Sequence, residues 1–190
     1  LLGSAYDVIR RLGRGAMGTV YLAHDVVLDR KVAIKAVPEC GTGADTLRTE
    51  AASIARVKSP FVVRIYASGA HQGRFFYVME HVDGPSLRTI LSELAAVGQY
   101  LPLGRAVTLL RQIATGAGDI HAAGLVHRDL KPENVVIEAG SGKPTLVDFG
   151  LTARVGAPLR PGFHGTVGYM PPELGDGNGG RNDPRIDVFA

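Results

Sequence analysis

The pattern of apolar residues changes once along this chain, near residues 80–84, and this change limits the fold more than any other feature. Before it, segments rich in Val, Ile, Leu and Tyr alternate with turn residues, which predicts short strands over 6–12, 19–24, 31–37, 61–67 and 74–79. Residues 45–57 differ, because apolar residues there recur at helical spacing behind Asp45, a favourable N-cap. Residues 1–82 are therefore expected to form an antiparallel sheet with one helix.

The second part of the chain, residues 83–190, predicts mainly helices. Ser86 can cap a helix that ends at residue 96, and Pro102 can open a longer helix that ends at residue 123. The longer helix is apolar over most of its circumference, which is typical of a core helix, and Gly124 supplies a left-handed stop. Further elements are expected at 135–138 and 145–148 (strands) and from about 184 (a helix). The fold class is thus α+β.

The composition excludes several classes of protein. Hydrophobic residues make up 45% and charged residues 21% of the 190 positions, which excludes a wholly disordered chain. The net charge of +3 suits a small anionic ligand but is too small and scattered for nucleic-acid binding. The single cysteine favours a reducing compartment, and no stretch reaches the roughly 18–20 apolar residues of a membrane span. We therefore expect a cytoplasmic location.

Three glycines, Gly13, Gly15 and Gly18, lie between the first two expected strands. Because they lack Cβ atoms, the backbone amides of such a hairpin can approach phosphate oxygens closely. A strand rather than a helix follows them, which argues against a dinucleotide-binding fold. The pattern alone leaves a flexible surface hairpin equally open.

Three further clusters carry charged groups at defined places. Val32-Ala33-Ile34-Lys35 ends an apolar strand with a lysine, and residues 127–134 read His-Arg-Asp-Leu-Lys-Pro-Glu-Asn. Asp148-Phe149-Gly150 follows another expected strand. Together with the glycines, these motifs resemble those of the eukaryotic-type protein serine/threonine kinases, most of all the bacterial members.

The resemblance covers essentially all 190 residues, including Met170-Pro171-Pro172-Glu173 and Asp187-Val188-Phe189-Ala190. It implies a two-lobe protein-kinase-like fold, with an N-lobe at 1–82 and a mostly helical C-lobe at 83–190. In the family the helical lobe continues well beyond Asp187, so the resemblance implies a C-terminally truncated domain. We expect these 190 residues alone to be poorly stable or inactive.

The resemblance also implies the roles of the polar residues. Asp129 is expected to be the catalytic base, Lys131 to neutralise charge on the transferred phosphoryl group, and Thr166 to brace both. Lys35 is expected to hold the α- and β-phosphates of ATP and to pair with Glu50 on the helix at 45–57. Asp148 and Asn134 are expected to bind Mg²⁺ or Mn²⁺.

The adenine site follows from the same resemblance. Leu12, Val20 and Ala33 are expected to form its roof, Val136 its floor and Met79 the gatekeeper. The backbone groups of Glu80 and Val82 are expected to face the purine edge. With Lys35 and the glycine loop, these residues would bind ATP. For the apolar members, packing in a sheet explains the residue types equally well.

One departure concerns regulation. Such kinases are usually activated by phosphorylation between Asp148 and Glu173, yet no Ser, Thr or Tyr occurs from residue 153 to residue 165. We expect activation without loop phosphorylation.

The resemblance favours an ATP-dependent, non-specific protein serine/threonine kinase acting on protein hydroxyls. The alternative is a pseudokinase or scaffold that binds nucleotide or partner proteins without catalysis. The presence of Lys35, Glu50, Asp129, Asn134 and Asp148 disfavours it. A small-molecule phosphotransferase fits less well with Thr166 and the Pro-Pro-Glu element. A membrane anchor or sensor domain beyond Ala190, as in bacterial relatives, would make this the cytoplasmic part of an anchored kinase.

Overall fold

The computed structural model describes residues 5–15, 18–38, 42–159, 166–174 and 180–190. The side chains of residues 42–44, 46, 47, 50 and 173 lie outside the description. The chain divides into two compact units, each described here by itself. The N-terminal unit comprises residues 1–56 and 63–81, and the C-terminal unit comprises residues 57–62 and 82–190.

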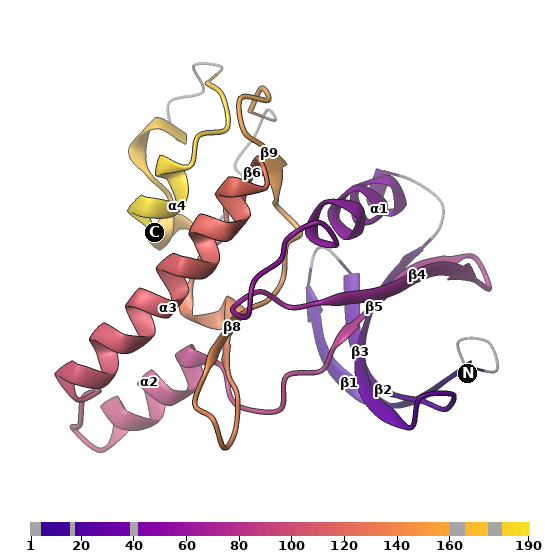
Figure 1. Cartoon of the computed structure of the whole chain (residues 1–190), viewed down its shortest axis with the longest axis horizontal. Helices are drawn as coiled ribbons and strands as arrows, with labels where there is room; N and C mark the ends of the chain where they lie inside the picture. The colour runs from indigo at the N-terminus through magenta and orange to yellow at the C-terminus, as the bar shows by residue number, and fades with distance from the viewer. Residues whose placement is uncertain (1–4, 16–17, 39–41, 160–165, 175–179) are drawn as a thin grey trace. The chain divides into compact units, whose positions relative to one another are not determined.

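The N-terminal unit is built on a five-stranded antiparallel sheet, in the order β1-β2-β3-β5-β4 (Figure 1). Its elements are β1 (Tyr6–Gly15), β2 (Gly18–Asp25), β3 (Arg30–Pro38), α1 (Thr42–Ile54), β4 (Ile65–His71) and β5 (Arg74–Glu80). The expected sheet and helix are thus present. The helix begins and ends three residues earlier than the sequence suggests. The fourth strand runs over Ile65–His71 rather than 61–67, because Phe61 and Val62 pair with Leu146 instead, whose N–H donates to the Phe61 carbonyl at 2.8 Å.

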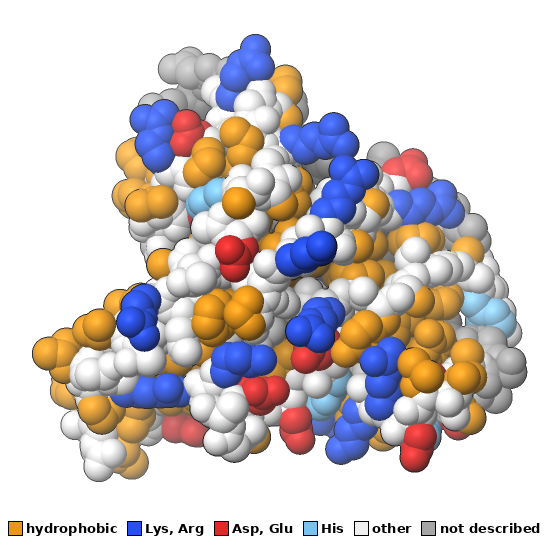
Figure 2. All heavy atoms as spheres, viewed as in Figure 1, with side chains coloured by type: hydrophobic (Ala, Val, Ile, Leu, Met, Phe, Trp, Pro, Cys, Tyr) orange, Lys and Arg blue, Asp and Glu red, His pale blue; other side chains and the backbone are white. Residues whose placement is uncertain are grey.

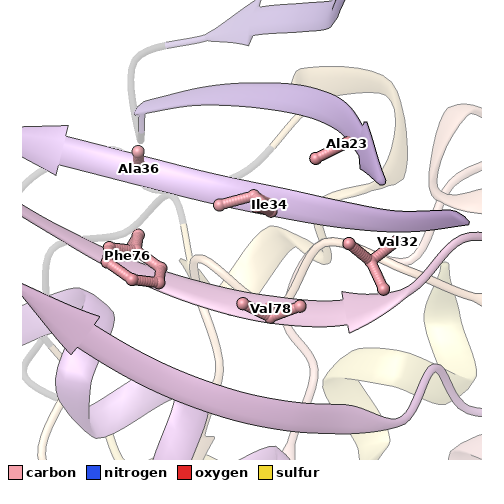
Figure 3. Packing of buried hydrophobic residues seen from close by; sticks show 6 residues of the cluster. All are labelled: Ala23, Val32, Ile34, Ala36, Phe76 and Val78. Atoms are coloured by element: carbon pink, nitrogen blue, oxygen red, sulfur yellow. The ribbon is translucent and has the colours of Figure 1, made fainter. Parts of the chain in front are cut away.

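Strand register gives the sheet two different faces. One face carries a buried hydrophobic cluster contributed by β2, β3 and β5 (Figure 3), whose members are Ala23, Val32, Ile34, Ala36, Phe76 and Val78. Since successive side chains of a strand point to opposite sides, the other face carries Val20, Ala33, Lys35 and Met79. The sheet therefore presents these four residues together.

The C-terminal unit contains α2 (Leu87–Ala96) and the 20-residue α3 (Leu103–Ala122). Its short strands form two antiparallel pairs, β6 (Leu125–Val126) with β9 (Ala153–Arg154) and β7 (Val135–Ile137) with β8 (Pro144–Leu146). Three 3₁₀ turns, η2 (Pro132–Asn134), η3 (Val167–Tyr169) and η4 (Pro172–Leu174), and the short helix α4 (Arg185–Phe189) complete it.

In the C-terminal unit, unlike at α1, the helix ends follow the sequence closely. The Ser86 side chain accepts a hydrogen bond from the Thr89 backbone N–H, as an N-cap does. Gly124 has φ +76° and ends α3 as expected. However, α3 is not buried all round: Leu109 and Ile120 are buried, whereas Val107 and Leu110 are 56% and 65% exposed.

We predict that Gly18→Ala destabilises the intact protein by about 2 kcal/mol. Gly18 has φ +116°, and an added Cβ would meet the Ala36 carbonyl oxygen and Val37 Cγ1 at 2.7 Å. Gly13→Ala is the matched control, because a Cβ there meets nothing within 4 Å. Urea titration measures both variants, and equal destabilisation would contradict the prediction.

Candidate active site

Three polar residues of the segment between β6 and β7, together with Thr166 before η3, form one hydrogen-bonded network. Lys131 Nζ lies 2.7 Å from Asp129 Oδ2 and donates a second bond, also of 2.7 Å, to Thr166 Oγ1. Thr166 in turn donates to Asp129 Oδ1 at 2.9 Å, and Asn134 Nδ2 donates to Asp129 Oδ2 at 2.9 Å. The Asp129 carboxylate is thus held by three donors, one of which is the Lys131 ammonium group.

A buried carboxylate that is distant in the sequence, Asp187, bonds directly to the segment that carries this network. The backbone N–H groups of His127 and Arg128 each donate to it at 2.7 Å. His121 Nε2 lies 2.8 Å from Asp187 Oδ2. Arg128 has φ +70°, a strained backbone conformation for a non-glycine residue, and its N–H bond to Asp187 fixes this bend. Asp187 therefore determines the direction in which the following residue, Asp129, leaves the bend.

The ring of His127, in the same segment, lies in the buried interior. It is fully buried and packs against Phe149, with ring centroids 4.7 Å apart. Burial lowers the pKa of His127 below its ordinary value, although the carboxylates of Asp187, Asp129 and Asp148 oppose the shift. The ring is therefore neutral at pH 7, and its Nδ1 accepts a bond from the Asp129 N–H.

Asp148 directly precedes Phe149, the neighbour of the His127 ring, and lies in a second strained turn. Its φ is +62°, its side chain is exposed, and the preceding Val147 N–H donates to the Asn134 carbonyl at 2.9 Å. Asp148 and Asn134 offer hard oxygen donors, the kind that Mg²⁺ prefers. Within the described residues, no group of three or more His, Cys, Asp or Glu side chains could hold a metal ion. Two protein ligands nevertheless fit Mg²⁺, because this ion usually binds to one or two such groups and to substrate phosphates.

The expected nucleotide-binding residues of the N-terminal unit lie on the sheet. Lys35 is buried on β3, between Val20 on β2 and Tyr77 on β5. Gly13 and Gly15 adjoin open space, and Leu12 is 39% exposed. The Glu50 side chain, the expected partner of Lys35, lies outside the described residues.

Three other expected nucleotide-binding residues lie at the end of β5 and beyond. Glu80 is half-buried, and its N–H donates to the Arg64 carbonyl at 2.9 Å. Val82 and Val136 are half-buried residues of the C-terminal unit.

Sequence reasoning missed the polar contacts that join distant parts of the C-terminal unit. Asp187 was expected only as part of a helix that starts near residue 184. Arg88 of α2 was not singled out, yet it bonds to both Glu133 and Tyr169. No local pattern signals such contacts, because the partners are 45 to 81 residues apart.

Surface charge and helix length complete the description. Figure 2 shows both acidic and basic side chains on the face in view. Within the described residues, none of the helices has the length and apolar character required to cross a bilayer.

Comparison of the sequence with known proteins shows that this chain is similar to protein kinases. The family model for the protein kinase domain matches residues 6–190. The chain is 40% identical over 194 residues to serine/threonine-protein kinase PknD of Mycobacterium tuberculosis, with 97% of this chain and 28% of the relative covered. It is 37% identical to PknL of the same species, with 100% and 48% covered, and 31% identical to PrkC of Bacillus subtilis, with 100% and 29% covered. The chain thus spans from about a quarter to about half of the length of these curated relatives.

We predict that Asp187→Ala destabilises the intact protein by about 3–5 kcal/mol, because two buried backbone N–H groups lose their acceptor. Asp187→Asn keeps one acceptor oxygen and should cost less, about 1–3 kcal/mol. The control is Glu93→Gln, an exposed carboxylate of α2, which should change stability little. Urea unfolding measures the stability of all three variants. If Asp187→Ala left the free energy of unfolding unchanged, the role given to this carboxylate would be contradicted.

Proposed function

This chain belongs to the protein kinase family, and from that premise we propose that it is the catalytic part of an ATP-dependent enzyme that phosphorylates serine and threonine hydroxyls of proteins. The observation that carries the proposal is the network of Asp129, Lys131 and Thr166. The names of the relatives, all serine/threonine-protein kinases, support the same reaction.

In the proposed reaction Asp129 is the catalytic base. A carboxylate offers about four acceptor sites, and the three described donors occupy three of them, which leaves one for the incoming hydroxyl. The hydroxyl oxygen forms a bond to the γ-phosphorus, the bond from the γ-phosphorus to the β,γ-bridging oxygen breaks, and the hydroxyl proton passes to Asp129. The products are the phosphorylated protein and ADP.

Lys131 is proposed to stabilise the negative charge on the group in transfer. Its ammonium already lies between Asp129 and Thr166, so no rearrangement is needed to bring a positive charge beside the base. Charge placed in advance in a partly buried site stabilises a transition state more than mobile solvent does. The Thr166 hydroxyl, which accepts from Lys131 and donates to Asp129, fixes the spacing of the two.

Mg²⁺ is the proposed metal, held by Asp148 and Asn134, and when bound it would neutralise charge on the ATP phosphates. The Asn134 amide nitrogen donates to the Asp129 carboxylate and carbonyl, so its amide oxygen is the atom that would meet the ion. Mn²⁺ has the same preference for oxygen ligands and could take the same place.

ATP is proposed to bind along the sheet face that carries Val20, Ala33, Lys35 and Met79. The backbone of Gly13 and Gly15 would approach the phosphates. A Cβ atom at either position would meet nothing within 4 Å, so packing within the protein does not explain why these residues are glycines. Gly18 differs, because packing against β3 already requires it. Glu50 remains the proposed partner of Lys35, and the adenine ring would contact Leu12, Glu80, Val82 and Val136.

The segment after Asp148 supports activation without loop phosphorylation. Its first part pairs with the rest of the unit through β6 and β9, and the Gly156 N–H donates to the Asn182 carbonyl at 2.8 Å. The buried Asn182 side chain donates to the Ala157 carbonyl at 2.9 Å, and the Leu159 N–H bonds to the Gly180 carbonyl. Backbone pairing and one asparagine therefore hold this part of the segment in the way that a phosphate does elsewhere.

Phosphoryl transfer from labelled ATP to a generic basic protein tests the proposed function in the intact protein. Asp129→Asn should lower kcat about 10²–10⁴-fold, because the base is lost while the side-chain shape is kept. ATP binding should be unchanged. Asp29→Asn, a surface carboxylate with 93% of its side chain exposed, is the control.

Lys35→Met and Asp148→Ala should also abolish transfer. Nucleotide binding by the unmodified protein without any transfer would instead favour the scaffold alternative.

Phosphatase treatment of the intact protein should leave its rate unchanged, because residues 153–165 contain no hydroxyl to phosphorylate. Intact-mass spectrometry should find no activating phosphate on Thr152 or Thr166. A stoichiometric phosphate at either residue, whose removal lowers the rate tenfold or more, would refute this mode of activation.

A further inference from the structure

Arg88, in the first turn of α2, joins two segments that flank the catalytic network. Its Nε donates to Glu133 Oε1 at 2.8 Å, and its Nη2 donates to the Tyr169 hydroxyl at 2.6 Å. The partners are 45 and 81 residues away along the chain. We propose that Arg88 is a positioning residue for phosphoryl transfer, which holds Thr166 and Asp129 at their working distance through Glu133 and Tyr169. The proposal rests on the proposed kinase function.

The first branch of this connection runs through the catalytic segment. Glu133 lies in the turn η2, between Lys131 and Asn134, both of which bond to Asp129. A carboxylate tied to Arg88 therefore anchors the turn that carries two of the three donors to the base.

The second branch runs through η3. The Tyr169 N–H donates to the Thr166 carbonyl at 2.8 Å, so the phenol held by Arg88 belongs to the same turn as the third donor. Thr166 Oγ1 then bonds to Asp129 Oδ1 and Lys131 Nζ. The guanidinium group of Arg88 is thus connected to the network twice, through Glu133 in η2 and through Tyr169 in η3.

Arginine is suited to this bridge and lysine is not. The planar guanidinium presents donors in fixed directions, whereas a lysine ammonium is a single point charge on a flexible stem.

The contribution of Arg88 is expected in geometry rather than in stability. The side chains of Arg88 and Glu133 are each 43% exposed, and exposed ion pairs add little to folding stability. By contrast, a displacement of about 1 Å in a catalytic site can cost about 10²-fold in rate. The two effects can therefore be separated by experiment.

Steady-state kinetics of the intact protein test this role. Arg88→Ala should lower kcat about 10–100-fold, with the KM for ATP within about twofold, since the proposed nucleotide contacts are made by other residues. Arg88→Lys should recover little of the loss. Tyr169→Phe should lower kcat less, and combining it with Arg88→Ala should cost less than the two separate effects together. The control is Lys143→Ala, which breaks a pair with Glu138 inside a single hairpin.

Hydrogen exchange at the Tyr169 amide gives a readout that does not need activity. Exchange should become at least fivefold faster in Arg88→Ala and stay unchanged in Lys143→Ala. If the unmodified protein transfers no phosphate, the proposed function fails while exchange still decides the positioning role. An unchanged exchange rate, an unchanged kcat, or full rescue by Arg88→Lys would overturn the proposal.

Discussion

Two hydrogen bonds from consecutive backbone N–H groups to one buried carboxylate hold the bend that leads into the proposed catalytic segment. Asp187 accepts both from residues 127 and 128, at 2.7 Å each. Hydrogen bonds to a charged acceptor contribute about 1.5–3 kcal/mol each, enough to hold the left-handed bend at Arg128. Asp129 directly follows that bend, so the orientation of the proposed base depends on a carboxylate that never meets the substrate.

The same principle recurs elsewhere in the C-terminal unit, where residues distant in the sequence hold the proposed catalytic side chains. Thr166 braces Asp129 from 37 residues away, and Arg88 reaches Tyr169 across 81 residues. In the N-terminal unit the regular sheet does this directly, because strand register is enough to set Lys35 beside Val20. A rigid sheet and a cross-braced loop are two solutions to one requirement, which is preorganisation.

Features with a local cause were predictable from the sequence. Segments rich in Val, Ile, Leu and Tyr between turn residues identified most of the strands, and Ser86 and Gly124 set helix ends. The resemblance to protein kinases singled out Asp129, Lys131 and Thr166, which the fold brings together. Features with a distant cause were not predictable. The two-residue strands β6 and β9 are too short to show a period, and the helix expected to be a core helix all round exposes Leu110. The bonds to Asp187 span about 60 residues and leave no mark in the local sequence.

The position of Asp187 so late in the chain has a consequence for folding during synthesis. The strands of the N-terminal sheet are all made by residue 80, and they pair mainly with neighbours in the sequence. The catalytic segment at 127–134 cannot take its final shape until residue 187 has left the ribosome, which is about 5–20 s after the sheet at 5–20 residues per second. During that interval a growing chain would hold a finished N-terminal sheet while the proposed base is not yet held in place, so the proposed phosphoryl transfer would be withheld until synthesis has passed this carboxylate.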